Sequence, residues 1–199
     1  MVRKYKNTKV RQKQIIDAAR KTIIKYGSEH VTVKRIAKEV GFSESAIYRH
    51  FKSKRDILLL LVDSIEESLV GDITRATAEG HTPLEILDSV LRSHLSAIEQ
   101  RRGISFLVIA EIISLGDKKL NVKVCNAIDT YTGCLKNLLA EGVKSGEVRE
   151  DIDLEATATA LFSIIQGLVN IWALSNYSFD PQEKYVPLWN TFREAVIKR

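Results

Sequence analysis

Residues that interrupt helices are rare in this sequence. Proline occurs three times and glycine ten times among the 199 residues. Proline breaks the interior of a helix because it lacks an N–H group and clashes with the preceding turn, and glycine costs about 1 kcal/mol relative to alanine. Between these residues, apolar side chains recur three and four positions apart, which is the period of an α-helix. The sequence therefore predicts an all-α chain of about nine helices, over residues 10–26, 32–40, 43–50, 53–78, 83–100, 104–114, 120–144, 154–174 and 181–198.

Positive charge is concentrated in the first part of the chain. Residues 1–60 contain 16 Lys and Arg against 5 Asp and Glu, a net charge of +11, whereas residues 61–199 contain 14 against 20, a net charge of −6. A basic segment is attracted to phosphates and releases counterions when it binds them. A solvated basic surface would have the same composition. The positive charge therefore indicates binding to nucleic acid only if a binding motif accompanies it.

Residues 32–51 supply such a motif. Two short predicted helices are joined by a turn at Gly41, with Thr32 and Ser43 placed as N-caps. Two helices joined in this way form a helix-turn-helix, whose second helix enters the major groove of DNA. The sequence therefore predicts DNA binding through residues 43–50.

Eleven residues are candidates for contact with DNA. Short or hydrogen-bonding side chains on the second helix face the bases, and basic or hydroxyl side chains around it face phosphates. For Thr32 and Ser43 capping is a compatible role, for Tyr48 the alternative is core packing, and for Glu44 and Lys54 it is a solvated charge. The candidates are Thr32, Lys34, Arg35, Ser43, Glu44, Ser45, Tyr48, Arg49, His50, Lys52 and Lys54.

Residues 10–60 resemble the N-terminal signature of the TetR family of transcriptional regulators. The family pattern often has an acid directly after its lysine, whereas here Arg55 stands there and Asp56 follows. The matching positions are Tyr26-Gly27, Val31-Thr32-Val33, Ile36-Ala37, Val40-Gly41, Ser43, the run from Ile47 to Lys54, and Ile57-Leu58.

This resemblance implies a homodimeric repressor of two domains. Residues 1–55 would form the three-helix DNA-binding domain with a basic N-terminal arm, and residues 56–199 a helical domain for dimerisation and effector binding. The segments 154–176 and 181–198 would pair with those of a second copy, so that the dimer binds a palindromic operator with half-sites about 34 Å apart. Core packing explains the apolar content of these segments equally well. The interface candidates are Phe162, Ile165, Trp172, Trp189 and Phe192.

The same resemblance implies an effector pocket among the middle helices, whose ligand moves the helix predicted at 53–78. Gln166 and Asn170 are polar, lie four residues apart and so share a helical face. Buried polar groups need partners, which a ligand or another helix can supply. A mostly apolar lining favours a hydrophobic effector. The pocket candidates are Phe106, Ile109, Ile128, Tyr131, Phe162, Gln166 and Asn170.

Enzymatic and metal chemistry have no signature in the sequence. There is no nucleophile elbow, P-loop or dinucleotide motif, and His81 and His94 lack partners at ligand spacing. We therefore expect a protein that is not an enzyme and uses no cofactor or metal. The alternative function is a DNA-bound interaction protein whose C-terminal domain binds another protein instead of a metabolite.

The apolar segment 156–174 is the nearest approach to a membrane span. Polar residues interrupt it, so we expect a buried helix, no contact with a membrane, and a cytoplasmic protein. The interrupting residues are Thr157, Thr159, Ser163, Gln166, Gly167 and Asn170.

Overall fold

The computed structural model describes residues 8–27, 30–49, 51–78, 80–100 and 103–198. Within these ranges the regular secondary structure is helical, and the all-α prediction is confirmed. The predicted bounds agree to within about two residues. The helices are α1 (Thr8–Tyr26), α2 (Val33–Val40), α3 (Glu44–Tyr48), α4 (Lys54–Ala78), α5 (Pro83–Gln100), α6 (Ile104–Leu115), α7 (Lys118–Lys144), α8 (Leu154–Leu174) and α9 (Pro181–Val196).

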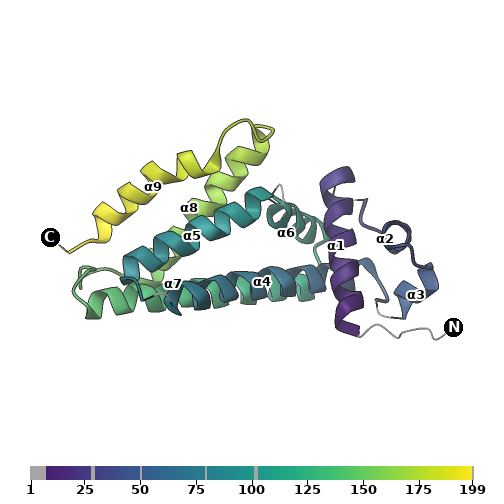
Figure 1. Ribbon diagram of the computed structural model, residues 1–199, viewed down its shortest axis with the longest axis horizontal. Helices are drawn as coiled ribbons and strands as arrows, with labels where there is room; N and C mark the ends of the chain where they lie inside the picture. Colours follow the sequence, from purple (N-terminus) through teal and green to yellow (C-terminus); the bar gives the residue numbers. More distant parts are fainter. Residues whose placement is uncertain (1–7, 28–29, 50, 79, 101–102, 199) are drawn as a thin grey trace.

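The helices are arranged along one long axis (Figure 1). The short helices α2 and α3 lie at one end, beyond α1, and α9 lies towards the other end. The long helices α4 and α7 run side by side between them, with α5 and α8 packed against α7. The last helix ends earlier than predicted because Ile197 takes an extended conformation and pairs with Val148 in an isolated β-bridge.

Aspartate side chains define where three of the C-terminal helices begin. Asp117, Asp153 and Asp180 each accept hydrogen bonds from two backbone N–H groups in the first turn of α7, α8 and α9. The carboxylate satisfies donors that have no partner within the helix and also suits the positive end of the helix dipole. These local contacts explain why the helix starts follow closely from the sequence.

The described buried side chains form two hydrophobic clusters that share α4. Ile57 and Leu58, near the start of α4, pack in the cluster of α1–α3, which also takes in residues of α6 and the first part of α7. Ile73 and Ala76, near its end, pack in the cluster of α5, α8, α9 and the rest of α7. The division into residues 1–55 and 56–199 stays a prediction, since the buried core extends across that point.

Helix α8 is long and apolar enough to cross a membrane by length and composition alone. The core helix of a soluble protein passes the same test. One side of α8 is buried in the protein, through residues such as Leu161, Ile165 and Val169.

Gly142, in the last turn of α7, tests how tightly the end of the molecule is packed. A Cβ atom there would lie 2.7 Å from Cγ2 of the fully buried, β-branched Val148. We expect Gly142→Ala to lower the free energy of unfolding by about 1–3 kcal/mol, as overpacked cores do. Gly133→Ala, on the same helix with nothing within 4 Å, should instead be neutral or stabilising by up to about 1 kcal/mol. Urea unfolding of both variants measures the difference, and equal changes would contradict the packing argument.

Candidate nucleic-acid interface and ligand pocket

The geometry of α2 and α3 is fixed by local contacts. Thr32 and Ser43 are N-caps as predicted, and their hydroxyls accept hydrogen bonds from the backbone N–H groups of Arg35 and Ala46, both at 3.2 Å. Gly41 ends α2 with a φ of 74°, a left-handed conformation that glycine adopts without steric cost. Buried side chains such as Ile36 and Ile47 hold the two helices together. The outer face of α3 is consequently presented to solvent.

Most of the candidate DNA contacts lie on this open surface. Tyr48 is 50% exposed, so core packing does not explain it. His50 lies outside the described residues. The candidates that are exposed are Thr32, Lys34, Ser43, Glu44, Ser45, Tyr48, Arg49 and Lys52.

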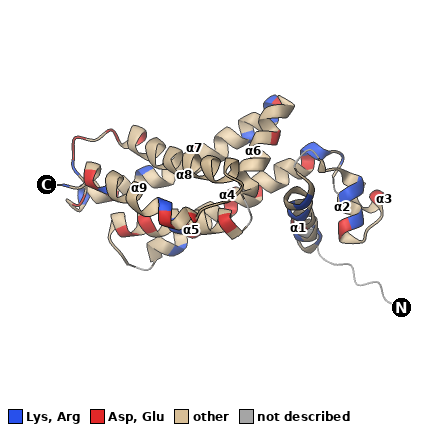
Figure 2. Ribbon diagram, turned by 90° about the horizontal axis from the view of Figure 1, so that it is seen from above, with Lys and Arg blue, Asp and Glu red and all other residues tan. Residues whose placement is uncertain are grey.

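A groove separates the starts of α2 and α3, and basic side chains line it. It is bounded by Thr32, Lys34, Arg35 and Ser43, and also by Lys38, which is not among the predicted DNA contacts. Figure 2 shows Lys and Arg gathered on α1 and α2, at the end of the molecule away from α9. This arrangement suits binding to a phosphate backbone.

Arg35 is held more firmly than a surface arginine. Its guanidinium carbon lies 4.4 Å from the centre of the Tyr26 ring, within range of a cation–π interaction. One terminal nitrogen of this guanidinium is buried with no hydrogen-bond partner among the described residues. Buried donors are normally satisfied, so this nitrogen is an exception beside the groove.

Lys54 does not lie on the open surface where the sequence placed it. Its side chain is 26% exposed, and its Nζ atom donates to Oε1 of Glu111 on α6 at 2.6 Å. The adjacent Arg55 pairs with Asp117, the N-cap of α7, at 3.3 Å. The first turn of α4 is therefore attached by ion pairs to both α6 and α7.

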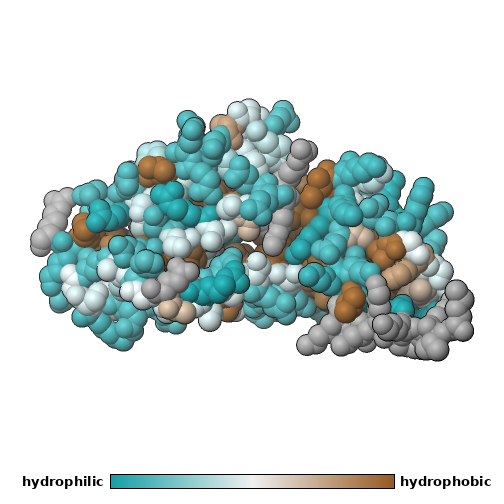
Figure 3. Space-filling model, viewed as in Figure 1, coloured by the Kyte–Doolittle hydropathy of each residue, from teal (hydrophilic) through white to brown (hydrophobic). Residues whose placement is uncertain are grey.

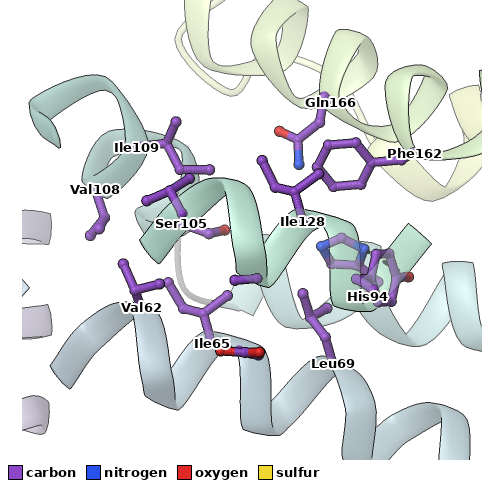
Figure 4. Close-up of a pocket in the computed structure, with 14 residues that line it drawn as sticks. Val62, Ile65, Leu69, His94, Ser105, Val108, Ile109, Ile128, Phe162 and Gln166 are labelled. Carbon is purple, nitrogen blue, oxygen red and sulfur yellow. Dashed lines mark hydrogen bonds between the residues drawn. The ribbon is translucent and has the colours of Figure 1, made fainter. Parts of the chain in front are cut away.

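An apolar cavity of about 50 Å³ lies between α4, α5, α6, α7 and α8 (Figure 4). Five predicted pocket residues line it, namely Ile109, Ile128, Tyr131, Phe162 and Gln166. Phe106 and Asn170 do not line it, so their place in an effector pocket stays a prediction. Phe106 packs against the C-terminal cluster instead, and Asn170 is half-buried outside the lining.

Two helices, α4 and α5, contribute to this cavity although no sequence pattern predicted their side chains there. Val62, Ile65, Glu66 and Leu69 of α4 line it, together with His94 of α5. The apolar residues among them recur at helical spacing, which is also the pattern of ordinary core positions. The pattern therefore carried no signal that distinguishes a cavity wall from a packed core.

His94 and Tyr131 form a buried neutral pair beside the cavity. Nδ1 of His94 lies 3.2 Å from the Tyr131 hydroxyl oxygen. Burial lowers the pKa of His94 to about 4 and raises the pKa of Tyr131 above its ordinary value. Both side chains are consequently uncharged at neutral pH.

The predicted interface residues are buried inside the single subunit. Ile165, Trp172, Trp189 and Phe192 all belong to the C-terminal cluster, and Phe162 lines the cavity, so their place in a dimer interface stays a prediction. Other apolar side chains on α8 and α9 face solvent instead. They are Ile171, Leu174, Val186 and Leu188, of which Leu174 is 84% exposed. An exposed apolar set of this kind is typical of an interaction surface. The face drawn in Figure 3 is mostly hydrophilic, with apolar residues in small separate areas.

Comparison with known proteins gives two family matches that together span most of the chain. The model described as "Bacterial regulatory proteins, tetR family" matches residues 15–61. The model described as "YsiA-like protein, C-terminal region" matches residues 63–191.

Individual relatives are similar over nearly their full length. The fatty acid metabolism regulator protein of Bacillus subtilis is 28% identical over 92% of both chains. The nucleoid occlusion factor SlmA of a Marinomonas species is 27% identical over 94% of this chain and 95% of that one. The crystal structure of FadR from B. subtilis in complex with stearoyl-CoA is 29% identical, with a TM-score of 0.73 over 92% of this chain and 95% of that one.

Tyr48 provides a test of the recognition surface. Because its ring is exposed on the outer face of α3, we expect Tyr48→Ala to weaken binding to the operator by about 1–3 kcal/mol and to leave the fold intact. Circular dichroism and urea unfolding would verify the fold, and fluorescence anisotropy the binding. Unchanged affinity would remove Tyr48 from the contact surface.

Lys54 requires a paired experiment, because its ammonium group already binds Glu111. If Lys54 also neutralises a phosphate, Lys54→Ala should weaken binding to all DNA sequences and lower the salt-dependence slope by about one unit per subunit. Glu111→Gln removes the ion pair but keeps the lysine, so it should keep the full slope. Equal slopes for Lys54→Ala and the wild type would mean that Lys54 serves only to join α4 to α6.

Proposed function

The chain belongs to the tetR family of regulatory proteins, and on that premise we propose that it is a repressor which a small hydrophobic effector releases from a palindromic operator in the cytoplasm. The observation that carries the proposal is the apolar cavity against α4. A helix that lines a ligand cavity and also packs against the DNA-binding unit can connect effector binding to the release of DNA.

The connection runs along α4. Val62 and Leu69 form part of the cavity wall, while Ile57 and Leu58 pack against the helix-turn-helix unit. A cavity of about 50 Å³ has room for only a few water molecules. An effector larger than that has to widen the cavity, and because α4 forms one wall of it, we propose that α4 moves relative to α6, α7 or α8. The protein then has a DNA-binding state and a released state. The effector shifts the equilibrium towards the released state by the ratio of its affinities for the two states.

The relatives support a hydrophobic effector. The FadR protein of B. subtilis was crystallised with stearoyl-CoA, which has a long apolar chain. The nucleoid occlusion factors are nearly as similar in sequence, and they give the alternative of a DNA-bound interaction protein its own support. An internal apolar cavity favours the first function, because a protein partner requires an exposed surface instead.

Dimerisation is proposed through the outer faces of α8 and α9. Ile171 and Leu174 of α8 and Val186 and Leu188 of α9 are exposed apolar side chains. A single helix-turn-helix covers little DNA, whereas two in a symmetric dimer bind both halves of a palindrome. Burying this apolar set against a second copy would remove it from water.

Leu174 tests both the dimer and its role on DNA. The side chain is 84% exposed, so Leu174→Asp should not disturb the subunit fold, but it would bury an unpaired charge in the interface. We expect a monomer in sedimentation and at least a roughly tenfold loss of affinity for a palindromic site selected from random DNA.

Val122→Asp is the matched control, because Val122 is an exposed valine on α7 and not on the two helices of the proposed interface. It should remain dimeric with unchanged affinity. A Leu174→Asp protein that stays dimeric and binds the palindrome normally would overturn the proposed interface.

A further inference from the structure

The polar groups around the cavity identify the kind of head group that an effector presents there. Building on the proposed function, we infer that this site takes an apolar molecule bearing an uncharged carbonyl group, such as an ester, thioester, amide or ketone, in preference to a free carboxylate. The inference rests on the tautomer of His94, on two polar side chains without partners, and on the charges along the wall.

The contact with Tyr131 selects the tautomer of His94. The two side chains lie 3.2 Å apart, His94 is 4% exposed and Tyr131 is 1% exposed. If His94 donated from Nδ1, the buried tyrosine O–H would have no acceptor among the described residues, which carries a desolvation cost. The tyrosine therefore donates to Nδ1, and the ring proton of the neutral histidine resides on Nε2.

His94 consequently provides an N–H donor at the cavity. It is one of the lining residues, and its Nε2 atom has no hydrogen-bond partner within the described part of the chain. A neutral N–H donor matches a neutral acceptor such as a carbonyl oxygen. It does not supply the positive charge that would offset the burial of a carboxylate.

Gln166 and Ser105 add further unpartnered polar groups. Both line the cavity, Gln166 from α8 and Ser105 from α6, and the structure gives neither side chain a hydrogen bond to another described residue. Figure 4 shows Gln166 close to Phe162 and Ile128, and Ser105 on the α6 side. A few polar groups in the wall of an apolar pocket are the usual means of fixing the orientation of a ligand.

The charges along the wall are unfavourable to an anion. Glu66 is the charged residue among those that line the cavity, and none of the lining residues that the structure describes is Lys or Arg. The nearby Lys123 is already paired with Asp63 and Glu66, at 2.8 Å each. A carboxylate head group would thus lose its hydration without gaining a cation from the lining residues that the structure describes, whereas a carbonyl group avoids that cost.

Two probes of eight carbons separate these cases, 2-octanone and octanoate. Calorimetric titration of the full-length protein at pH 7.5 should give a dissociation constant roughly tenfold or more lower for the ketone than for the carboxylate. Octanoate binding as tightly as 2-octanone would overturn the inference while leaving a hydrophobic effector site in place. If neither probe binds, the effector site of the proposed function fails, and this inference fails with it.

Two variants test whether the preference for the ketone over the carboxylate arises in the cavity. Gln166→Leu removes an amide from the wall, and Asn170→Leu makes the same kind of change one turn further along α8, outside the lining. We expect Gln166→Leu to reduce the preference for the ketone by roughly fivefold to tenfold and Asn170→Leu to leave it unchanged. The same ratio of affinities in both variants and the wild type would contradict recognition by Gln166.

Discussion

The packing of α4 on both hydrophobic clusters is the constraint on which the rest of the structure depends. Ile57 and Leu58 belong to the cluster that contains α1–α3, and Ile73 and Ala76 belong to the cluster that contains α5, α8 and α9. Packed cores have discrete arrangements and do not deform continuously. A shift in the middle of α4 therefore has to be accommodated by the position of the DNA-binding unit.

The cavity occupies the place where the two clusters meet. Val62, Val108 and Val124 of the N-terminal cluster line it together with Tyr131 and Phe162 on the C-terminal side. Apolar walls that do not touch one another give up dispersion contacts, and Nε2 of His94 has no hydrogen-bond partner among the described residues. A ligand that fills the cavity and accepts a hydrogen bond from His94 would gain affinity from both contacts. It would bind beside α4, where a change in the distance between α4 and the opposite helices acts on α4 directly.

Ion pairs surround the same helix on its more exposed sides. Lys54 with Glu111 and Arg55 with Asp117 connect the first turn of α4 to α6 and α7, and Lys123 joins α7 to the middle of α4. Ion pairs near the surface typically contribute only about 0–1 kcal/mol each. They can orient α4 without preventing its movement, while the apolar contacts provide most of the cohesion.

The sequence by itself determined the helices, the helix-turn-helix unit and most of its exposed face, because caps such as Thr32 and Ser43, the turn at Gly41 and the helical period all act within a few residues. Only the tertiary structure decided which apolar side chains of the C-terminal helices are covered and which groups meet across the chain. It buried Trp172, left Leu174 exposed, and brought Glu111 to Lys54 across 57 positions of sequence. Apolar character shows that a side chain tends to leave water, but the neighbour that covers it is chosen by packing between distant segments.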